Sequence, residues 1–305
     1  MRILIIGAGV LGTFYGARLS ASGHDVTIFA RQLRAQQVRL DGLVVEQRRH
    51  GSLRARVKVI ESLGRDDAYD YVIVLVRNEQ VDSVLPMLAA NVATPNIAFM
   101  FNNAAGPQLL IGALGQDRVM LGFPGAGGER DSDGAVHAAI VTPIIQKTTV
   151  GELDGRLTPR VRRLAGVLKM AGFPTAISRS MDAWLKTHVA LVSPIAEAFY
   201  AAGGQMKSLS ANKPLVLDMV RNIRHAFAAL RALGIPITPS RLRGIEWVPE
   251  WMLVGLCRLA FRSEYAELII ARHANSARTE MAILSGQLRT LVGNSPSSRG
   301  VTTSG

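Results

Sequence analysis

With 305 residues, of which 48% are hydrophobic and only 19% charged, the chain is long enough for two well-packed domains and too apolar for a disordered protein. Its single cysteine, Cys257, excludes an intramolecular disulfide and a cysteine-based metal site, and no apolar stretch approaches about 20 residues, so we expect a cytoplasmic protein without metal or membrane. The net charge of +12 favours an anionic cofactor or substrate, whereas basic groups without interleaved aromatic residues argue against nucleic acid.

The N-terminal residues predict a strand, a tight turn, a helix and a second strand. Residues 3–6 are apolar and β-rich, glycines follow at once, and apolar residues then recur at helical spacing up to Gly23. Residues 26–29 return to strand character, which completes a right-handed βαβ unit. Strands are further expected at 71–76, 96–101 and 119–123, and helices at 81–90, 107–114 and 159–171. This alternation predicts a doubly wound parallel sheet.

From residue 125 onward the pattern changes. Segments 135–143 and 148–151 are expected as antiparallel additions that close the domain, with a last strand near 175–177. Long helical patterns then cover 181–202, 213–233, 249–262 and 276–292. The predicted fold is therefore α/β, with an N-terminal Rossmann domain at 1–178 and a C-terminal all-helical domain at 179–292. Residues 293–305 are rich in Ser, Gly and Thr and are expected to form a disordered tail.

The turn after the first strand carries a glycine pattern typical of dinucleotide-binding proteins. It reads Gly7, Ala8, Gly9, Val10, Leu11, Gly12. In such a loop the first glycine permits the tight turn, the second lets the backbone approach a pyrophosphate, and the third allows close helix packing. The pattern alone is weak evidence, but the strand before it, the helix after it and the strand beyond favour a cofactor site over a purely structural turn.

The end of the second predicted strand indicates which cofactor is favoured. Sites for NAD usually place a carboxylate there, but residues 28–32 contain no acid. Arg31 can instead pair with a 2′-phosphate, and Arg34 could assist from the following turn. We therefore predict NADP(H), with an ordinary surface arginine as the alternative reading of Arg31.

Six separate segments resemble the ketopantoate reductase family, over residues 1–292. They are the loop at 7–12, Arg31, and residues 75–80, 101–103, 183–186 and 278–280. The resemblance implies an NADP-dependent oxidoreductase acting on CH–OH, with a Rossmann domain and a helical domain arranged as in 6-phosphogluconate dehydrogenase. Without the family resemblance, the alternative interpretation is that the Lys186 ammonium reaches solvent and that Glu280 is an exposed helix carboxylate.

The resemblance also implies roles for single residues. Lys186 matches the lysine that protonates the developing alkoxide, and Glu280 matches the glutamate that hydrogen-bonds the substrate hydroxyl, so both are predicted as catalytic and substrate-binding. Asn102 matches an asparagine that contacts the cofactor and the substrate side. Arg77 stands where the family usually has a lysine and is predicted to contact the cofactor or the substrate carboxylate. Ser193 replaces an asparagine of the family and is predicted to bind substrate.

Departures from the family pattern gather at the predicted substrate site. The asparagine expected one turn after Lys186 is missing, and residues 268–274 hold no counterpart of a usual serine and aspartate. His188 and His273 stand near these positions, either as new substrate ligands or as structural histidines. The substrate is therefore less closely defined than the reaction class.

We accordingly predict NADPH-dependent reduction of a small 2-keto acid, with ketopantoate to pantoate, a step of pantothenate biosynthesis, as the leading candidate. One alternative is another hydroxy-acid dehydrogenase built from a Rossmann and a helical domain. A second is an NADPH-binding sensor without turnover. Trp247 and Trp251 belong either to the core or to a homodimer interface.

Overall fold

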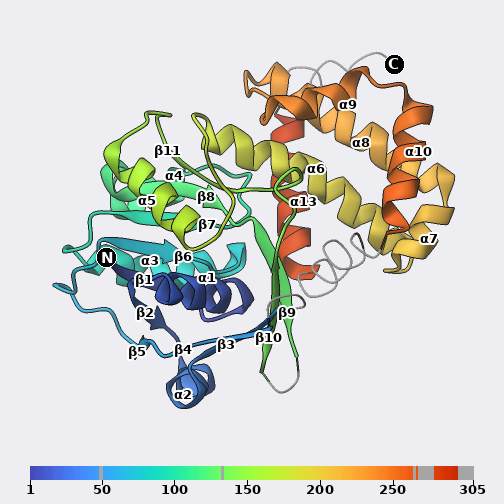
Figure 1. Ribbon diagram of the computed structural model, residues 1–305. Coiled ribbons are helices and arrows are strands. Elements are labelled where there is room, and N and C mark those ends of the chain that lie inside the picture. The colour runs from blue at the N-terminus through green and yellow to red at the C-terminus, as the bar shows by residue number, and fades with distance from the viewer. Residues whose placement is uncertain (48–50, 132–133, 264–265, 267–277, 295–305) are drawn as a thin grey trace. The chain divides into compact units, whose positions relative to one another are not determined.

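The computed structural model describes residues 1–47, 51–131, 134–263, 266 and 278–294 (Figure 1). The chain divides into two compact units. The first combines Met1–Phe101 with Pro107–Met181, and the second combines Asn102–Gly106 with the residues from Asp182 onward. The second unit begins close to the predicted residue 179, but it also takes in the short segment 102–106, which no sequence pattern indicated. Predicted tail residues 295–305 lie outside the described residues.

The main sheet of the first unit has, among the described residues, eight strands in the order β12-β11-β8-β7-β6-β1-β2-β5. The strands are β1 (Arg2–Ile6), β2 (Asp25–Phe29), β5 (Lys58–Ile60), β6 (Tyr71–Val74), β7 (Ile97–Met100), β8 (Val119–Phe123), β11 (Thr148–Glu152) and β12 (Thr175–Ile177). All pairs from β5 to β8 are parallel, which confirms the doubly wound sheet. Strand order reverses at β1, between β2 and β6, and ligands of such sheets bind outside the carboxyl ends of the strands at this switch point.

Helices connect the strands of this sheet. They are α1 (Val10–Ala21), α2 (Gln32–Asp41), α3 (Val81–Ala90), α4 (Gln108–Leu114) and α5 (Pro159–Met170), with single 3₁₀ turns η1 (Asn78–Gln80) and η2 (Gln116–Arg118). Helix α5 begins where expected because Pro159 fits its first turn and the Thr158 hydroxyl accepts a hydrogen bond from the Val161 N–H.

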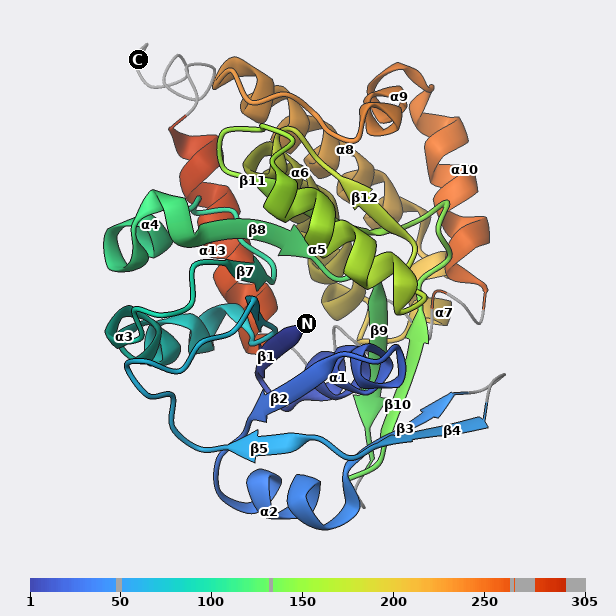
Figure 2. The ribbon, with the colours of Figure 1, turned by 60° about the vertical axis from the view of Figure 1, so that its left-hand side comes forward.

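A second sheet packs on α1 (Figure 2). Its order is β4-β3-β10-β9, formed by β3 (Leu43–Gln47), β4 (Gly51–Ala55), β9 (Ala126–Arg130) and β10 (Val136–Ile140). The antiparallel strand predicted within 135–143 is confirmed, because β10 pairs antiparallel with β9; it also pairs parallel with β3 and so belongs to this second sheet and not to the main one. Burial explains the separate sheet. Val136 and Ala138 are buried while His137 is exposed, so one face of the strand packs on the core and the other faces solvent. The prediction for 148–151 is confirmed, since β11 pairs antiparallel with β8.

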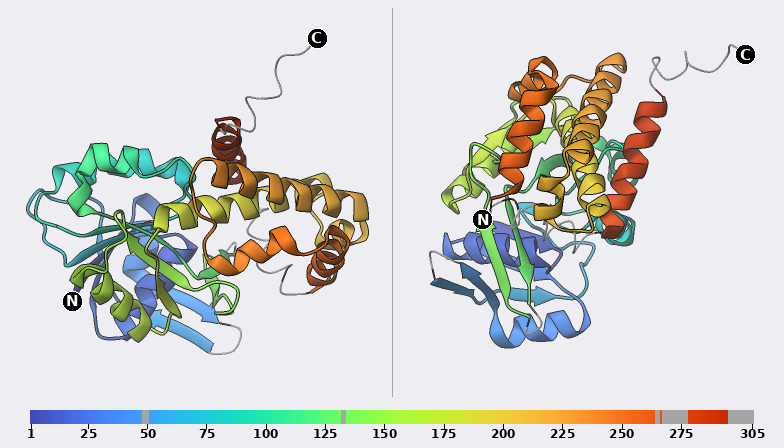
Figure 3. Two further views of the ribbon diagram at one scale, coloured as in Figure 1. Left: turned by 90° about the horizontal axis from the view of Figure 1, so that it is seen from above. Right: turned by 90° about the vertical axis from the view of Figure 1, so that its right-hand side faces the viewer.

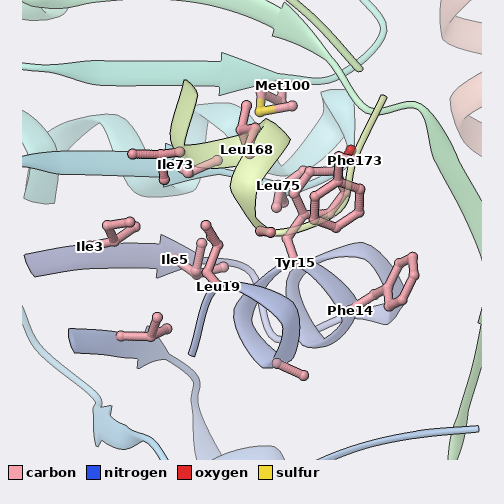
Figure 4. Packing of buried hydrophobic residues seen from close by; sticks show 14 of the residues in the cluster. Ile3, Ile5, Phe14, Tyr15, Leu19, Ile73, Leu75, Met100, Leu168 and Phe173 are labelled. Carbon is pink, nitrogen blue, oxygen red and sulfur yellow. The ribbon is translucent and has the colours of Figure 1, made fainter. Parts of the chain in front are cut away.

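In the core of the first unit, side chains of α1 pack against Phe173, which follows α5 (Figure 4). The ring of Tyr15 stacks on Phe173 at a centroid distance of 4.0 Å, and Phe14 meets Phe173 edge to face. The Tyr15 hydroxyl is also satisfied, at 2.6 Å from the hydroxyl of Thr148 on β11. Burial raises the pKa of the Tyr15 phenol far above its usual range, so the group stays neutral. This cluster fixes the start of α1, which carries the glycine loop.

The described part of the second unit consists of helices and connecting segments (Figure 3). The helices are α6 (Met181–Ala201), α7 (Met206–Ala211), α8 (Lys213–Ala232), α9 (Gly244–Trp247), α10 (Glu250–Phe261) and α13 (Arg278–Gly293), with a 3₁₀ turn η3 at Ser240–Arg243. The four predicted helices are confirmed, while α7 and α9 were not predicted. None of the described helices is long and apolar enough to cross a membrane.

Candidate cofactor-binding loop and active-site residues

The glycine loop joins β1 to α1, and backbone fills the space beside its first and third glycines. Gly7 has a φ of +107°, and a Cβ built on it would lie 2.6 Å from the carbonyl oxygen of Leu75 at the end of β6. A Cβ on Gly12 would lie 1.7 Å from the carbonyl oxygen of Gly7. Any other residue at either position would displace the loop. Both glycines are therefore required by the turn itself, as the sequence pattern predicted.

Gly9 has different surroundings, because a Cβ built there would meet none of the described atoms within 4 Å. This exposed residue is the N-cap of the 12-residue helix α1. No side chain caps the helix here, and the first N–H groups of a helix, at the positive end of its dipole, have no acceptor within the helix. Such N–H groups, beside the open space at Gly9, fit a diphosphate. The residues from Gly7 to Gly12 thus fit the dinucleotide for which they were predicted.

Arg34 holds this loop from helix α2. Its Nε donates to the carbonyl oxygen of Ala8 at 2.9 Å, and its Nη2 donates to the hydroxyl of Thr13 at 2.8 Å. Burial, followed by the nearby charge of Arg130, lowers the pKa of this guanidinium. Its donors thus already have partners within the loop, a positioning role that the sequence did not reveal.

The surroundings of Arg31 bear on the choice of cofactor. Arg31 is exposed, directly precedes α2, and lies over the ring of Phe29 at 5.1 Å. Beside it, Gln32 has a φ of +51°, and its N–H donates to the carboxylate of Glu61 at 3.4 Å. The hydrogen bond from Arg39 lowers the pKa of Glu61, which is therefore charged at neutral pH. Tertiary structure thus brings a carboxylate to the end of β2, which the local sequence lacks.

Arg77 follows β6, the strand next to β1 on the other side of the switch point. Its side chain is exposed, and its N–H donates to the side chain of Gln80 at 3.2 Å, which closes the turn η1. Because Gly7 packs against Leu75, the chain that leads to Arg77 starts beside the glycine loop. Sheet topology therefore places Arg77 and the loop at the carboxyl ends of neighbouring strands, where a dinucleotide binds in such folds.

Asn102 and Glu280 meet in the second unit. The Asn102 Nδ2 donates to Glu280 Oε1 at 3.0 Å, although the residues are 178 positions apart, and both are buried. Two turns along α13, Gln287 accepts the N–H of Ala104 at 2.9 Å. The segment itself is folded back by Asn103, whose side chain bonds the Ala105 N–H and the Gly106 carbonyl. Helix α13 therefore holds the 102–106 segment at two points, and the sequence had not indicated Gln287.

Lys186 lies on α6, one turn after Asp182. Its Nζ donates to Asp182 Oδ2 at 2.5 Å, and only 13% of the lysine side chain is exposed. The other carboxylate oxygen, Asp182 Oδ1, is buried and has no hydrogen-bond partner among the described residues. A lysine this buried needs a counter-charge or an acceptor. Asp182 supplies it, and sequence analysis missed this because an acid four residues before a lysine is common on helix surfaces.

His188 stacks on Trp184 one turn back along α6, with ring centroids 5.3 Å apart and planes at 11°. This contact accounts for His188 as a packing residue. Thr187, which directly precedes His188, is fully buried, and its hydroxyl accepts a hydrogen bond from the Thr238 N–H at 3.3 Å. Packing within the helical unit therefore holds the residues that follow Lys186 in place. The predictions for His273 and for residues 268–274 lie outside the described residues.

Ser193 is fully buried, and its hydroxyl lies 2.6 Å from that of Ser285 on α13. This contact joins α6 to α13 within the helical core. The geometry supports a helix-packing role for Ser193 and gives no support to its predicted contact with substrate.

Comparison with known proteins identifies the family and the fold. Residues 3–155 match the family model described as ketopantoate reductase PanE/ApbA. An uncharacterized oxidoreductase, YkpB of Bacillus subtilis (strain 168), is 26% identical over 244 residues, covering 79% of this chain and 78% of that protein. The crystal structure of 2-dehydropantoate 2-reductase from Methylococcus capsulatus has the same fold, with 20% identity and a TM-score of 0.65 over 96% of this chain and 95% of that chain. The structure of D-mandelate dehydrogenase with NADH and anilino(oxo)acetate also has this fold, with 14% identity and a TM-score of 0.66 over 96% of this chain and 98% of that chain.

The family match covers half of the chain and contains the whole glycine loop, Arg31, Arg77 and Asn102. The oxidoreductase relative extends the similarity to most of the remaining residues. The loop geometry fits the nicotinamide dinucleotide that such enzymes use. The chain therefore belongs to the ketopantoate reductase PanE/ApbA family.

Proposed function

We propose that this protein reduces a small 2-keto acid with NADPH, and that ketopantoate, converted to pantoate, is the leading substrate. The hydrogen bond between Asn102 and Glu280 carries this proposal, because it joins two distant residues that the family resemblance names separately. A sensor that had lost its substrate site would have no need of a buried carboxylate held in this way. Participation in pantothenate biosynthesis and a cytoplasmic location follow from this substrate as part of the proposal.

Four side chains carry out the proposed chemistry. Bound NADPH supplies a hydride to the carbonyl carbon of the substrate. The N–H groups at the start of α1 bind the diphosphate, and Arg77 binds the cofactor beside them. Lys186 stabilises the negative charge that develops on the substrate oxygen and then transfers a proton to it from Nζ. Glu280 accepts the hydrogen bond of the substrate hydroxyl, and Asn102 orients Glu280 through the 3.0 Å contact.

Turnover of NADPH with a panel of 2-keto acids that includes ketopantoate tests this function. Lys186→Ala should lower kcat by about 100-fold or more, the usual contribution of a general acid, with NADPH affinity unchanged. Lys169→Ala, which changes an exposed lysine of α5, is the matched control. Absence of turnover with every acid, despite NADPH binding, would favour the sensor, and unchanged turnover in Lys186→Ala would remove this lysine from the mechanism.

A second candidate uses NADH and a different hydroxy acid. Glu61 favours it, since a carboxylate at the end of β2 is the group that usually binds the ribose hydroxyl of NAD. The similar D-mandelate dehydrogenase structure contains NADH. Two variants separate the candidates. If NADPH is the cofactor, Arg31→Ala should weaken NADPH binding by roughly 10-fold and leave NADH binding nearly unchanged, because only NADPH offers a 2′-phosphate. If NADH is the cofactor, Glu61→Gln should weaken NADH binding instead.

A further inference from the structure

A cavity lies at the amino edge of the main sheet, where the strands begin. Its volume is about 380 Å³, and it is bounded by the starts of β1 and β6, the segment before β7 and helix α5. The N-terminus, labelled in Figure 1, lies at this edge. Pockets for small ligands begin at about 300 Å³, so the cavity has room for one small organic molecule. Its lining includes Arg2, Tyr69, Asp70, Tyr71, Asn96 and Arg163.

Two guanidinium groups line this cavity from different elements. Arg163 lies on α5 and is exposed, and its guanidinium has no hydrogen bond or ion pair with any described residue. Arg2 lies at the start of β1 and stands over the ring of Tyr69 at 5.4 Å, with the carboxylate of Asp25 at 3.9 Å. Guanidinium groups present forks of N–H donors that match the oxygens of a carboxylate or a phosphate. Both arginines therefore keep donors available for an anion.

The lining contains one carboxylate, that of Asp70, and this group already has a partner. Its Oδ2 accepts the backbone N–H of Arg2 at 2.8 Å, and the Asp70 carbonyl oxygen accepts the Asn96 Nδ2 at 3.0 Å. These two bonds join the segments at the starts of β1, β6 and β7, so the walls of the cavity are held together. Two positive groups thus stand against one negative group, a balance that favours an anionic ligand.

Two buried tyrosines, Tyr69 and Tyr71, also belong to the lining. The Tyr71 hydroxyl donates to the carbonyl oxygen of Arg160 at 2.8 Å, which leaves no polar group of this side chain unsatisfied. Burial raises the pKa of the Tyr71 phenol, and the nearby charge of Arg163 opposes this shift. Tyr71 is therefore neutral at physiological pH and adds no negative charge. A ligand in the cavity would meet aromatic surface together with the two guanidinium groups.

The cavity is remote from the glycine loop. Arg2 begins β1 and Gly7 directly follows it, so a rise of about 3.3 Å per residue separates the two by roughly 16 Å. A dinucleotide binds outside the carboxyl ends of the strands, at the other edge of the sheet. We propose that the cavity is a second ligand site, which binds a small organic anion through its carboxylate or phosphate group at Arg2 and Arg163.

The first test measures the binding of phenyl phosphate, benzoate and the neutral benzyl alcohol by isothermal titration calorimetry. The two anions distinguish a phosphate ligand from a carboxylate ligand, and binding of either supports the site. Arg163→Gln should weaken anion binding by about 10-fold or more, because charge-assisted hydrogen bonds are lost. Arg162→Gln, an exposed change on the same helix outside the lining, should have no effect. Equal binding of benzyl alcohol, equal losses in the two variants or no anion binding would overturn the proposal.

A second test locates the bound probe. Ala68 is an exposed residue of the lining, so Ala68→Cys in the Cys257→Ser background places the chain's single thiol at the cavity. The bound anion should slow alkylation of this thiol by iodoacetamide several-fold, because it covers the position. Met170→Cys, at an exposed position of α5 outside the lining, should react at an unchanged rate. Equal protection of both thiols, or protection of neither, would show that the anion binds elsewhere and would refute the site.

A third measurement separates this site from the glycine loop. Anion affinity should be the same with and without saturating NADPH, and Arg163→Gln should bind NADPH as the wild type does. Competition between the anion and NADPH would instead place the probe at the start of α1 and contradict a second site. None of these measurements requires turnover, so their outcome does not depend on the proposed reductase reaction.

Discussion

At the scale of single residues, Lys186 and Asp182 form the most consequential pair. The ammonium bonds Asp182 Oδ2 at 2.5 Å in a mostly buried position, so the lysine is oriented before any substrate arrives. We expect Asp182→Asn to lower kcat by about 10-fold and to leave NADPH affinity unchanged, because a misplaced lysine protonates poorly. Asp182→Glu, which keeps the charge, should recover most of the rate. Steady-state kinetics and cofactor titration of both variants provide the measurement.

An increase in kcat for Asp182→Asn would contradict this role and would mean that the pair holds the lysine away from the substrate. Equal losses in Asp182→Asn and Asp182→Glu would instead indicate a requirement for side-chain length.

At the scale of elements, the connection from β1 to α1 depends on helix α2 through Arg34. Removal of its hydrogen bonds to Ala8 and Thr13 should loosen the loop that binds the diphosphate, which NADPH and NADH share. Arg34→Met should therefore weaken both cofactors alike, by roughly 10-fold, since hydrogen bonds from a charged donor contribute about 1.5–3 kcal/mol. Fluorescence titration measures both affinities. A loss confined to NADPH would show that Arg34 binds the 2′-phosphate, the role considered from sequence alone.

Helix α13 has a corresponding role in the second unit, where Gln287 holds the backbone of Ala104 and Glu280 holds Asn102. Gln287→Leu should lower kcat several-fold, because the segment that orients Glu280 loses one of its two attachments. Gln287→Glu keeps the acceptor and should behave nearly as wild type. Arg289→Ala, an exposed change on the same helix, is the control for helix stability. Loss of kcat in the control to the same extent would refute this assignment.

At the scale of the whole molecule, we expect the protonation of His24 to make the stability of the folded protein depend on pH. Burial, followed by the charge of the N-terminus, lowers the pKa of His24 in the folded state below its ordinary value near 6.5. The unfolded chain therefore binds this proton more readily, so stability present above about pH 6.5 is lost as the pH falls. The melting temperature of wild type should drop between neutral and mildly acidic pH by on the order of 1 °C more than that of His24→Gln.

His225→Gln changes an exposed histidine and should follow the wild-type curve. Parallel melting curves for wild type and His24→Gln at all pH values would show that His24 does not contribute.

The local sequence determined those features of this protein that depend on neighbouring residues. Gly7 and Gly12 must be glycines because backbone fills the space around them, and the long helices α6, α8, α10 and α13 follow from apolar periodicity. Short strands such as β5, with three residues, carry too little periodicity to be recognised. The partners of β10 in the second sheet were not recognised, because the strands of this sheet are stabilised by packing on α1.

Only the tertiary structure decided which distant groups meet. Glu61 reaches the end of β2 because β5 pairs with β2, and Glu280 reaches Asn102 because α13 packs on the segment after β7. Neither contact has a local signal, since hydrogen bonds between residues far apart in the chain follow from the register of strands and the docking of helices. The burial of Ser193 and the exposure of Trp251 were open for the same reason: helical periodicity shows that a side is apolar, and only packing shows what covers it.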